Sequence, residues 1–291
     1  GLGLRVTDRF EAEGVRASEV TKAHAYLGYD LSPDARLALS GGLADHNTQF
    51  SIGSGGTAYT DGRAGFLRLD LERGGTRFRA FWNSGRPTLR EFEGPEDPYM
   101  EHNLYDLDLE HALSLSRRNR LVIGGGYRRA TIRSNSYSPQ RIEQDLGALF
   151  FENAFRSSEH VTVMASGRLD RHPLTGWVFS PRGSLVFSPG PDQVFRVSAG
   201  SSFRNPTLSE SYLRLTPTLQ SPLNVPIVVD IQGREDMEPE RMVMVELAHN
   251  GHFGRLKTAA AGFHYRLKDV ISVWADDPVL LLEPSPKVAV P

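Results

Sequence analysis

Apolar and polar residues alternate at every second position along many stretches of this chain. In the stretch 193–204 one face is apolar or small, and it consists of Phe195, Val197, Ala199, Ser201 and Phe203. The residues between them, which include Arg196 and Arg204, form a polar face. Successive side chains of a strand point to opposite sides. Each such segment is therefore predicted to be a strand with one face for an apolar environment and one for water.

The same alternation predicts roughly twelve strands. Most of them are about 10–14 residues long, beyond the ~5–6 residues of typical globular strands and long enough to cross a bilayer at a tilt. The predicted strands are 17–31, 35–44, 63–72, 76–83, 103–116, 120–132, 143–156, 160–171, 178–188, 193–204, 240–250 and 255–274.

Short and long connections alternate between these strands. The short ones carry turn residues such as Pro, Gly, Asn and Asp, and they are Ser32–Asp34, Arg73–Thr76, Arg117–Asn119, Ser157–Glu159, Pro189–Asp192 and Asn250–Phe253. The long ones are 45–62, 84–102, 133–142, 172–177 and 205–239. This alternation indicates an all-β fold: a transmembrane, antiparallel, up-and-down β-barrel with short periplasmic turns and long extracellular loops.

The apolar face also predicts a membrane as its surroundings. Aromatic residues on this face fall near strand ends, as in the interfacial girdles of membrane barrels: Tyr29, Phe187, Phe195, Trp82, Tyr105, Tyr127, Phe203, Phe263 and Tyr265. Aliphatic residues lie between them, among them Leu67, Val163, Val197 and Ala261. A soluble β-sandwich would place its largest rings in the middle instead. We therefore expect lipid, and not a second protein layer, outside this face.

The polar face is rich in charge and is predicted to line a lumen. If strands 63–72 and 76–83 form a hairpin, Glu72 faces Arg77 and Asp70 faces Arg79; strand 103–116 would then bring Asp106 near Arg79 and Asp108 near Arg77. The residues expected to face the lumen and to contact a domain inside it are Arg68, Asp70, Arg77, Arg79, Asp106, Asp108, Glu110, Arg128, Arg168, Arg196 and Glu246.

Composition agrees with this picture and narrows the chemistry. Apolar residues make up 39% of the 291, mean hydropathy is −0.35, and no apolar run approaches the ~18 residues of a membrane helix. The net charge of −2 argues against nucleic-acid binding, and the absence of cysteine excludes disulfides and thiolate metal sites. Asp45-His46-Asn47 has no visible catalytic partner, so a solvated loop is the favoured interpretation. We expect no enzymatic activity, no cofactor and no metal site.

The segment from Ser180 to Tyr212 resembles the barrel of TonB-dependent outer-membrane receptors. That family has a strand with "SPR", a short turn, and a strand ending in "FR-x-P" before an acidic residue; here Phe203-Arg-Asn-Pro206 and Glu210 match. Gly233–Glu240 loosely matches the family segment that leads into the next strand, and 145–153 with Arg168-Leu-Asp170 matches an earlier pair of strands. The resemblance covers about residues 100–270 and is moderately specific as an ordered set.

The resemblance implies an outer-membrane receptor of a Gram-negative bacterium for active uptake of a scarce ligand, such as an iron chelate, haem or cobalamin. Such receptors hold a plug domain inside a barrel of about 22 strands, and the TonB-ExbB-ExbD complex supplies force through the plug. Residues 1–291 are then expected to be a partial barrel without the plug. The expected partners are outer-membrane lipid, that complex and a small-molecule ligand. A passive porin is the main alternative; an outer-membrane enzyme or adhesin is a third.

The long loop 205–239 is the candidate ligand vestibule. Thr207 and Glu210 form a capping-box pattern that predicts a short helix over 208–215. The candidate ligand-binding residues are Arg204, Asn205, Glu210 and Tyr212, because arginine suits anionic groups. The competing interpretation, which we favour slightly, is that Arg204 and Pro206 simply end a strand at the rim.

Overall fold

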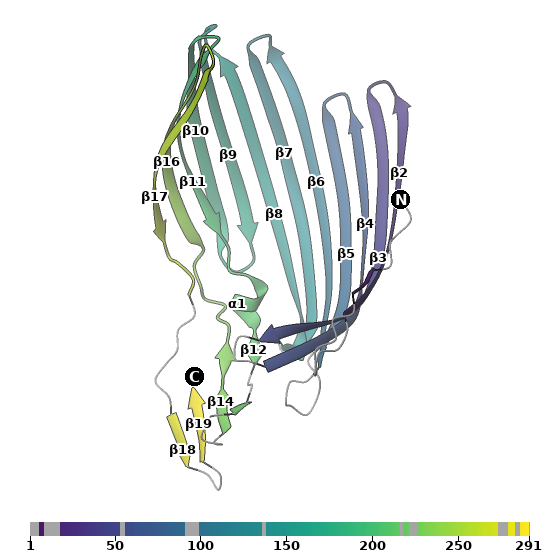
Figure 1. Ribbon diagram of the computed structural model, residues 1–291. Coiled ribbons are helices and arrows are strands. Elements are labelled where there is room, and N and C mark those ends of the chain that lie inside the picture. Colours follow the sequence, from purple (N-terminus) through teal and green to yellow (C-terminus); the bar gives the residue numbers. More distant parts are fainter. Residues whose placement is uncertain are drawn as a thin grey trace.

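The computed structural model describes residues 6–8, 18–52, 56–90, 99–135, 138–215, 218–220, 226–272, 279–282 and 286–290. Most of them form one 13-stranded sheet in the order β1 to β11, then β16 and β17, with every neighbouring pair antiparallel. Consecutive strands are neighbours in space, and the sheet curves into an open wall (Figure 1). This is the predicted up-and-down topology of a partial barrel.

The wall consists of long strands joined by short turns at one rim. Their bounds are β1 (Val6–Asp8), β2 (Ser18–Ser32), β3 (Ala35–Ile52), β4 (Gly56–Arg73), β5 (Thr76–Arg90), β6 (Met100–Ser116), β7 (Asn119–Ser134), β8 (Ser138–Arg156), β9 (Val161–His172), β10 (Gly176–Gly190), β11 (Gln193–Arg204), β16 (Glu240–Phe253) and β17 (Leu256–Lys268). All twelve predicted strands are present. The turns between β2 and β3, β4 and β5, and so on lie together at one rim, the short-turn side, at the top of Figure 1.

The segment 205–239 is more ordered than a simple loop. It contains the helix α1 (Leu208–Tyr212) and the strands β12 (Arg214–Leu215), β13 (Thr218–Gln220), β14 (Pro226–Val229) and β15 (Ile231–Gln232). β12 pairs with β15, and β13 and β14 join β19 (Pro286–Val290) and β18 (Val279–Leu282) in a four-stranded sheet. These elements lie at the rim opposite the short turns, which we call the loop side (Figure 1).

Three of the predicted long loops are wrong, and in one of them, 133–142, β7 continues to Ser134 and β8 begins again at Ser138. β3 runs on to Ile52, β4 begins at Gly56 and β5 continues to Arg90, so most of 45–62 and the first part of 84–102 are strand; residues 53–55 and 91–98 lie outside the described residues. The reason is visible at the register pair Asp45 and Arg63, where the outward positions become charged. The apolar alternation ends there, but the backbone hydrogen bonds of the hairpin continue.

The apolar face of the wall is not covered by another layer. Leu67, Val163 and Val197 keep 48%, 41% and 47% of their surface exposed. Among the residues that the structure describes, the buried hydrophobic ones are Ala35, Ile132, Val178 and Ala248. A soluble protein of this size would bury a continuous core. The exposed apolar face therefore matches the predicted contact with lipid.

The last strand of the wall departs from the prediction. Phe263 pairs with Glu246 and Tyr265 with Met244, so both rings lie on the polar side of the sheet, as does Ala261. A tight turn at Gly254, with φ of 62°, sets this register. Because side chains alternate with a period of two, a register different by one residue moves every side chain to the other face.

Candidate functional site: the charged wall and the Arg204 junction

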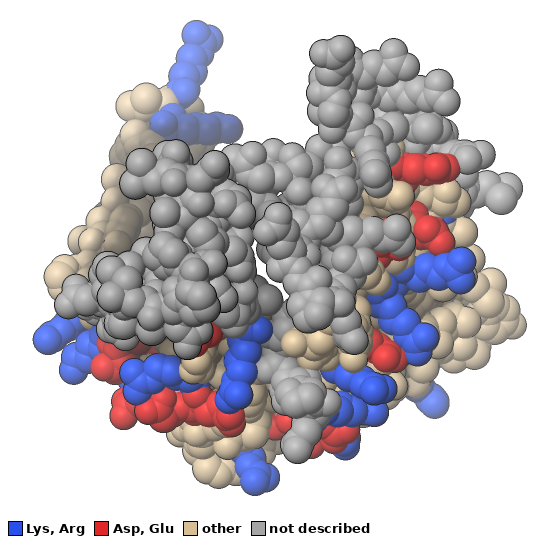
Figure 2. All heavy atoms as spheres, turned by 90° about the horizontal axis from the view of Figure 1, so that it is seen from below, with Lys and Arg blue, Asp and Glu red and all other residues tan. Residues whose placement is uncertain are grey.

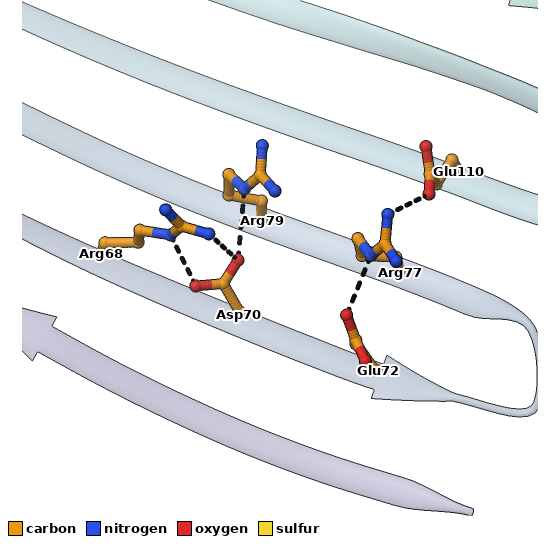
Figure 3. A network of polar contacts seen from close by, with 6 residues as sticks. All are labelled: Arg68, Asp70, Glu72, Arg77, Arg79 and Glu110. Atoms are coloured by element: carbon orange, nitrogen blue, oxygen red, sulfur yellow. Dashed lines mark hydrogen bonds and ion pairs between the residues drawn. The ribbon is translucent and has the colours of Figure 1, made fainter. Parts of the chain in front are cut away.

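The polar face of the wall carries linked ion pairs. Asp70 of β4 accepts two hydrogen bonds from Arg68, at 2.6 and 2.9 Å, and one from Arg79 of β5 at 3.2 Å (Figure 3). The predicted pairing of Asp70 with Arg79 is confirmed by the register of β4 and β5. One carboxylate thus neutralises part of the charge of two guanidinium groups.

A second set of ion pairs lies closer to the short turns. Arg77 donates to Glu72 at 2.9 Å and to Glu110 at 2.7 Å, so it links β4, β5 and β6 (Figure 3). The facing of Glu72 and Arg77 is the predicted one. The predicted neighbours on β6 are wrong by two residues.

The register of β5 and β6 shows the difference. Glu110 stands opposite Arg77, Asp108 opposite Arg79 and Asp106 opposite Phe81. A shift of two residues leaves each side chain on the same face, so face alternation alone does not reveal it. The long connection between these two strands supplies no turn that would fix the register from the sequence.

All the residues predicted to face the lumen share this one face. Three more pairs extend it: Arg128 with Asp106 at 2.6 Å, Arg168 with Asp170 at 3.0 Å, and Arg196 with Glu246. Seen from the loop side, basic and acidic side chains follow one another along the inner side of the wall (Figure 2). These pairs are partly exposed and contribute about 0.2–1 kcal/mol each. Their main effect is a hydrophilic surface with little net charge.

Arg204 forms the centre of a junction at the loop side. It ends β11 and donates to Glu240, the first residue of β16, at 2.7 Å from Nε and 2.9 Å from Nη2. Its Nη1 donates to both carboxylate oxygens of Glu210 in α1, at 3.0 and 2.9 Å. Glu240 Oε1 also accepts from the backbone N–H of Ile271 at 2.9 Å. We call Arg204, Glu210 and Glu240 the Arg204 junction.

The predicted capping box fixes the helix to this junction. Glu210 N–H donates to the Thr207 hydroxyl at 3.2 Å, and Thr207 N–H donates to Glu210 at 2.7 Å. The hydrogen bond from Arg204 is the main reason why the pKa of Glu210 lies below its usual value. The helix ends at Tyr212 and not at the predicted 215, because Leu213 adopts an extended backbone.

The other predicted vestibule residues also have partners in the protein. Asn205 accepts a hydrogen bond from the Thr175 hydroxyl at 2.9 Å, which ties the loop to the turn between β9 and β10. Tyr212 lies beside Gln144 of β8, and burial raises the pKa of Tyr212. The structure brings Arg204 and Glu210 into direct contact; in sequence, Asn205 follows Arg204 directly and Tyr212 comes two residues after Glu210. Ligand contact by these four residues stays a prediction.

Sequence reasoning missed Glu240 as the partner of Arg204. The available signal was the Pro239-Glu240 pair at the end of the family-like segment 233–240. No spacing rule joins it to Arg204, because 36 residues separate the two in sequence. Only the pairing of β11 with β16 places them opposite each other.

Two further features bear on the chemistry of the described residues. They contain no group of three His, Asp or Glu side chains placed to hold a metal ion. No helix in these parts of the chain has the length and apolar character needed to span a membrane. What the arrangement offers is a charged wall, with a rigid junction where the loop segment begins and ends.

The comparisons with known proteins agree with this geometry. The family model described as "TonB dependent receptor-like, beta-barrel" matches residues 7–280. No curated protein matches the sequence. The siderophore receptor PirA from Pseudomonas aeruginosa has a similar structure, with a TM-score of 0.70 and 16% identity, over 94% of this chain and 51% of PirA.

Two other solved structures are similar to the same extent. The FrpB iron transporter from Neisseria meningitidis gives a TM-score of 0.67 at 13% identity, over 94% of this chain and 48% of FrpB. The hemophore receptor HasR from Serratia marcescens, solved with its hemophore HasA and heme, gives 0.70 at 15%, over 94% and 50%. At these identities the likeness concerns the fold, and the chain spans about half the length of each. With the family model matched along nearly its whole length, the chain belongs to the TonB-dependent receptor β-barrel family.

Proposed function

We propose that this protein is an outer-membrane receptor of a Gram-negative bacterium that takes up a scarce ligand with energy from the inner membrane. The observation that carries the proposal is the two-faced wall, apolar outside and lined with ion pairs inside, in a chain whose family model is a receptor barrel. The ligand class we propose is an iron chelate, haem or cobalamin. The names of PirA, FrpB and HasR, which refer to siderophore, iron and heme, support the first two.

The charged wall is assigned to contact with a plug domain. We propose that a plug, expected outside residues 1–291, lies against the ion-paired face, and that the TonB-ExbB-ExbD complex acts through it. The support is electrostatic: paired charges give a surface that a folded polar domain can contact without leaving buried charges unpaired. The wall residues are those named above as lumen-facing, from Arg68 to Glu246.

The Arg204 junction is assigned to the extracellular vestibule. We propose that it holds the start of segment 205–239 in place. The position of this segment relative to a bound ligand would then be set by four residues: Arg204, Asn205, Glu210 and Tyr212. The guanidinium of Arg204 already engages two carboxylates. Its contribution to ligand binding is therefore expected to come from positioning and not from a free positive charge.

The test is uptake in a strain from which the full gene is deleted. Ferric siderophores, haem and cyanocobalamin are supplied one at a time under limiting conditions, and uptake is measured with and without a protonophore. The proposal requires loss of uptake of one ligand on deletion, recovery with the gene on a plasmid, and abolition by the protonophore. Uptake that continues with the protonophore present, or liposomes that swell in small neutral sugars, would instead support the passive porin.

A further inference from the structure

A cluster of arginines surrounds a hollow at the short-turn side of the wall. The hollow has a volume of about 610 Å³ and is lined by Arg117 and Arg118 of the β6–β7 turn, Arg120 at the start of β7 and Arg156 at the end of β8, together with Ser114 and Ala154. We call these four arginines the mouth arginines. The turn and the end of β8 are joined directly, because Arg156 N–H donates to the carbonyl of Arg118 at 2.7 Å.

The hollow opens on the inner side of the wall. Arg120 is paired in register with Ser114 of β6 and with Ala154 of β8. Ser114 lies four positions from Glu110 on β6, so both residues belong to the inner, polar face. The neighbouring residues on the opposite face are apolar, as Phe155 beside Ala154 shows. A ligand in this hollow therefore approaches from the lumen or from the short-turn side, and not from lipid.

The mouth arginines differ from the wall arginines in their electrostatics. Arg68, Arg77, Arg79, Arg128, Arg168 and Arg196 each form an ion pair with a carboxylate. None of the four mouth arginines does so with any carboxylate of the described residues. The acidic residues nearest to Arg156 in sequence are Glu152 and Glu159, and neither forms an ion pair with a mouth arginine. The one nearest to the other three is Glu110, which is paired with Arg77.

We propose that the mouth arginines bind an acidic peptide segment, one that carries several Asp or Glu side chains. A guanidinium forks onto a carboxylate with two parallel hydrogen bonds, and arginines are favoured where carboxylates are recognised. The four charges are spread over a turn and the ends of neighbouring strands, about 4.8 Å apart. A series of carboxylates along a peptide matches that spread, whereas a single small anion would engage only one or two of the arginines. The proposal does not depend on the identity of the transported ligand.

The experiment uses the full-length receptor in its native outer membrane. A photoreactive benzoylphenylalanine is placed at Ala154, which lines the hollow, or as a matched control at Phe155, which lies on the opposite face of the same strand. After irradiation, the cross-linked products are mapped by mass spectrometry. We expect a cross-link from position 154 to a peptide with at least two acidic residues next to the attachment point, and none to that peptide from position 155.

Charge variants then test the arginines themselves. In Arg118→Gln/Arg120→Gln/Arg156→Gln the cross-link yield is expected to fall at least fivefold, whereas Arg255→Gln/Lys257→Gln, at another short turn, leaves it unchanged. Added hexa-aspartate should compete for the cross-link, and hexa-asparagine should not. Migration of the unheated protein on gels verifies that each variant is folded. The proposal would be overturned by the absence of a cross-link, or by a cross-link to phospholipid or to a peptide without acidic residues. It would also be overturned if citrate at equal charge competed, or if the yield did not change in the arginine variant.

Discussion

At the scale of single residues, the Arg204 junction explains why an arginine stands at the end of β11. The guanidinium offers donors in a fixed plane, and here they reach two carboxylates that come from different elements, Glu240 of β16 and Glu210 of α1. A lysine has one compact charge and cannot fork onto both. The junction therefore connects a barrel strand, the next barrel strand and the loop helix through one side chain.

Removal of Arg204 is expected to loosen the loop but not the wall. Arg204→Ala leaves Glu210 and Glu240 close together without a counter-charge, at a cost of about 1–3 kcal/mol, since charge-assisted hydrogen bonds contribute more than exposed pairs. Limited proteolysis of intact cells should then cleave segment 205–239 at least fivefold faster, with an intermediate effect for Arg204→Lys. Arg196→Ala, which removes a pair from the inner wall, serves as the control. Unchanged cleavage in Arg204→Ala would contradict the anchoring role.

The junction should also respond to acid in a defined direction. Arg204 lowers the pKa of Glu210 below its usual value of 4.5 in the folded protein. Its contribution is thus complete above pH 4.5 and is lost as the pH falls through the lower, folded value. Hydrogen exchange of the peptide 205–215, corrected for the intrinsic rate, should be unchanged from pH 7 to 5 and should accelerate only as the pH falls below 4.5. In Glu210→Gln this acid-dependent step should shrink; an undiminished step would show that another group causes it.

The candidate site could be predicted from the sequence only in part. Arg204 and Glu210 were found because a family pattern and a capping box both point to them, and the capping box has a local physical cause. Glu240 and Gln144 were not found, because each meets its partner only after strands or loops distant in sequence have come together. Contacts between distant segments depend on strand order and register, which local patterns do not encode.

At the scale of elements, the strand prediction succeeded where lipid imposes an alternation and failed where it does not. From Arg73 back to Arg63, β4 presents Leu71, Leu69 and Leu67 to the outside, and this part was predicted correctly. Beyond Arg63 the next outward position, Asp61, is charged as well, so the apolar alternation ends although the strand begins at Gly56. The register error at β6 is a shift of two residues, which face alternation leaves open. The error at β17 has another cause: the turn predicted at Asn250–Phe253 lies at residues 254–255, because Phe253 pairs with Leu256.

The turn between β4 and β5 shows how turn chemistry fixes a register. Gly74 and Gly75 have φ of 53° and 83°, which favour glycine at both positions of a two-residue hairpin turn. A Cβ at Gly74 would meet open space, whereas one at Gly75 would lie 3.0 Å from the carbonyl oxygen of Ala112. A side chain at Gly74 would therefore meet only backbone strain, whereas one at Gly75 would meet backbone strain and a close contact with Ala112.

Two alanine substitutions are expected to differ accordingly. Gly74→Ala should lower the free energy of unfolding by about 1 kcal/mol, because alanine must adopt the left-handed backbone. Gly75→Ala should lower it by about 2 kcal/mol, because its Cβ also approaches β6 too closely. The midpoint of urea unfolding of the full-length protein in lipid vesicles measures both. Equal midpoints for the two variants would mean that the approach of Ala112 carries no cost.

At the scale of the whole molecule, the wall lacks a core of its own and depends on its surroundings. On β4, the outward apolar stretch lies between the charged positions Arg63 and Arg73, about 33 Å along the strand. At the tilt of about 40° usual for membrane barrels, this corresponds to a band about 25 Å tall. That height equals the apolar band of outer-membrane barrels, so the ends of the band mark the two membrane surfaces.

A charge placed at two depths on the same strand tests this placement. Leu67 lies near the middle of the band and Leu71 near its short-turn end, and both side chains face outward. Leu67→Arg should destabilise the full-length protein in lipid vesicles by about 2–4 kcal/mol, and Leu71→Arg by only about 0–1 kcal/mol, because the cost of an arginine falls toward the interface. Urea titration measures both, with Leu67→Ala and Leu71→Ala as size controls. Water outside the wall would make both arginines harmless, and a packed protein layer would make both costly, so only lipid predicts a steep difference between two residues four positions apart.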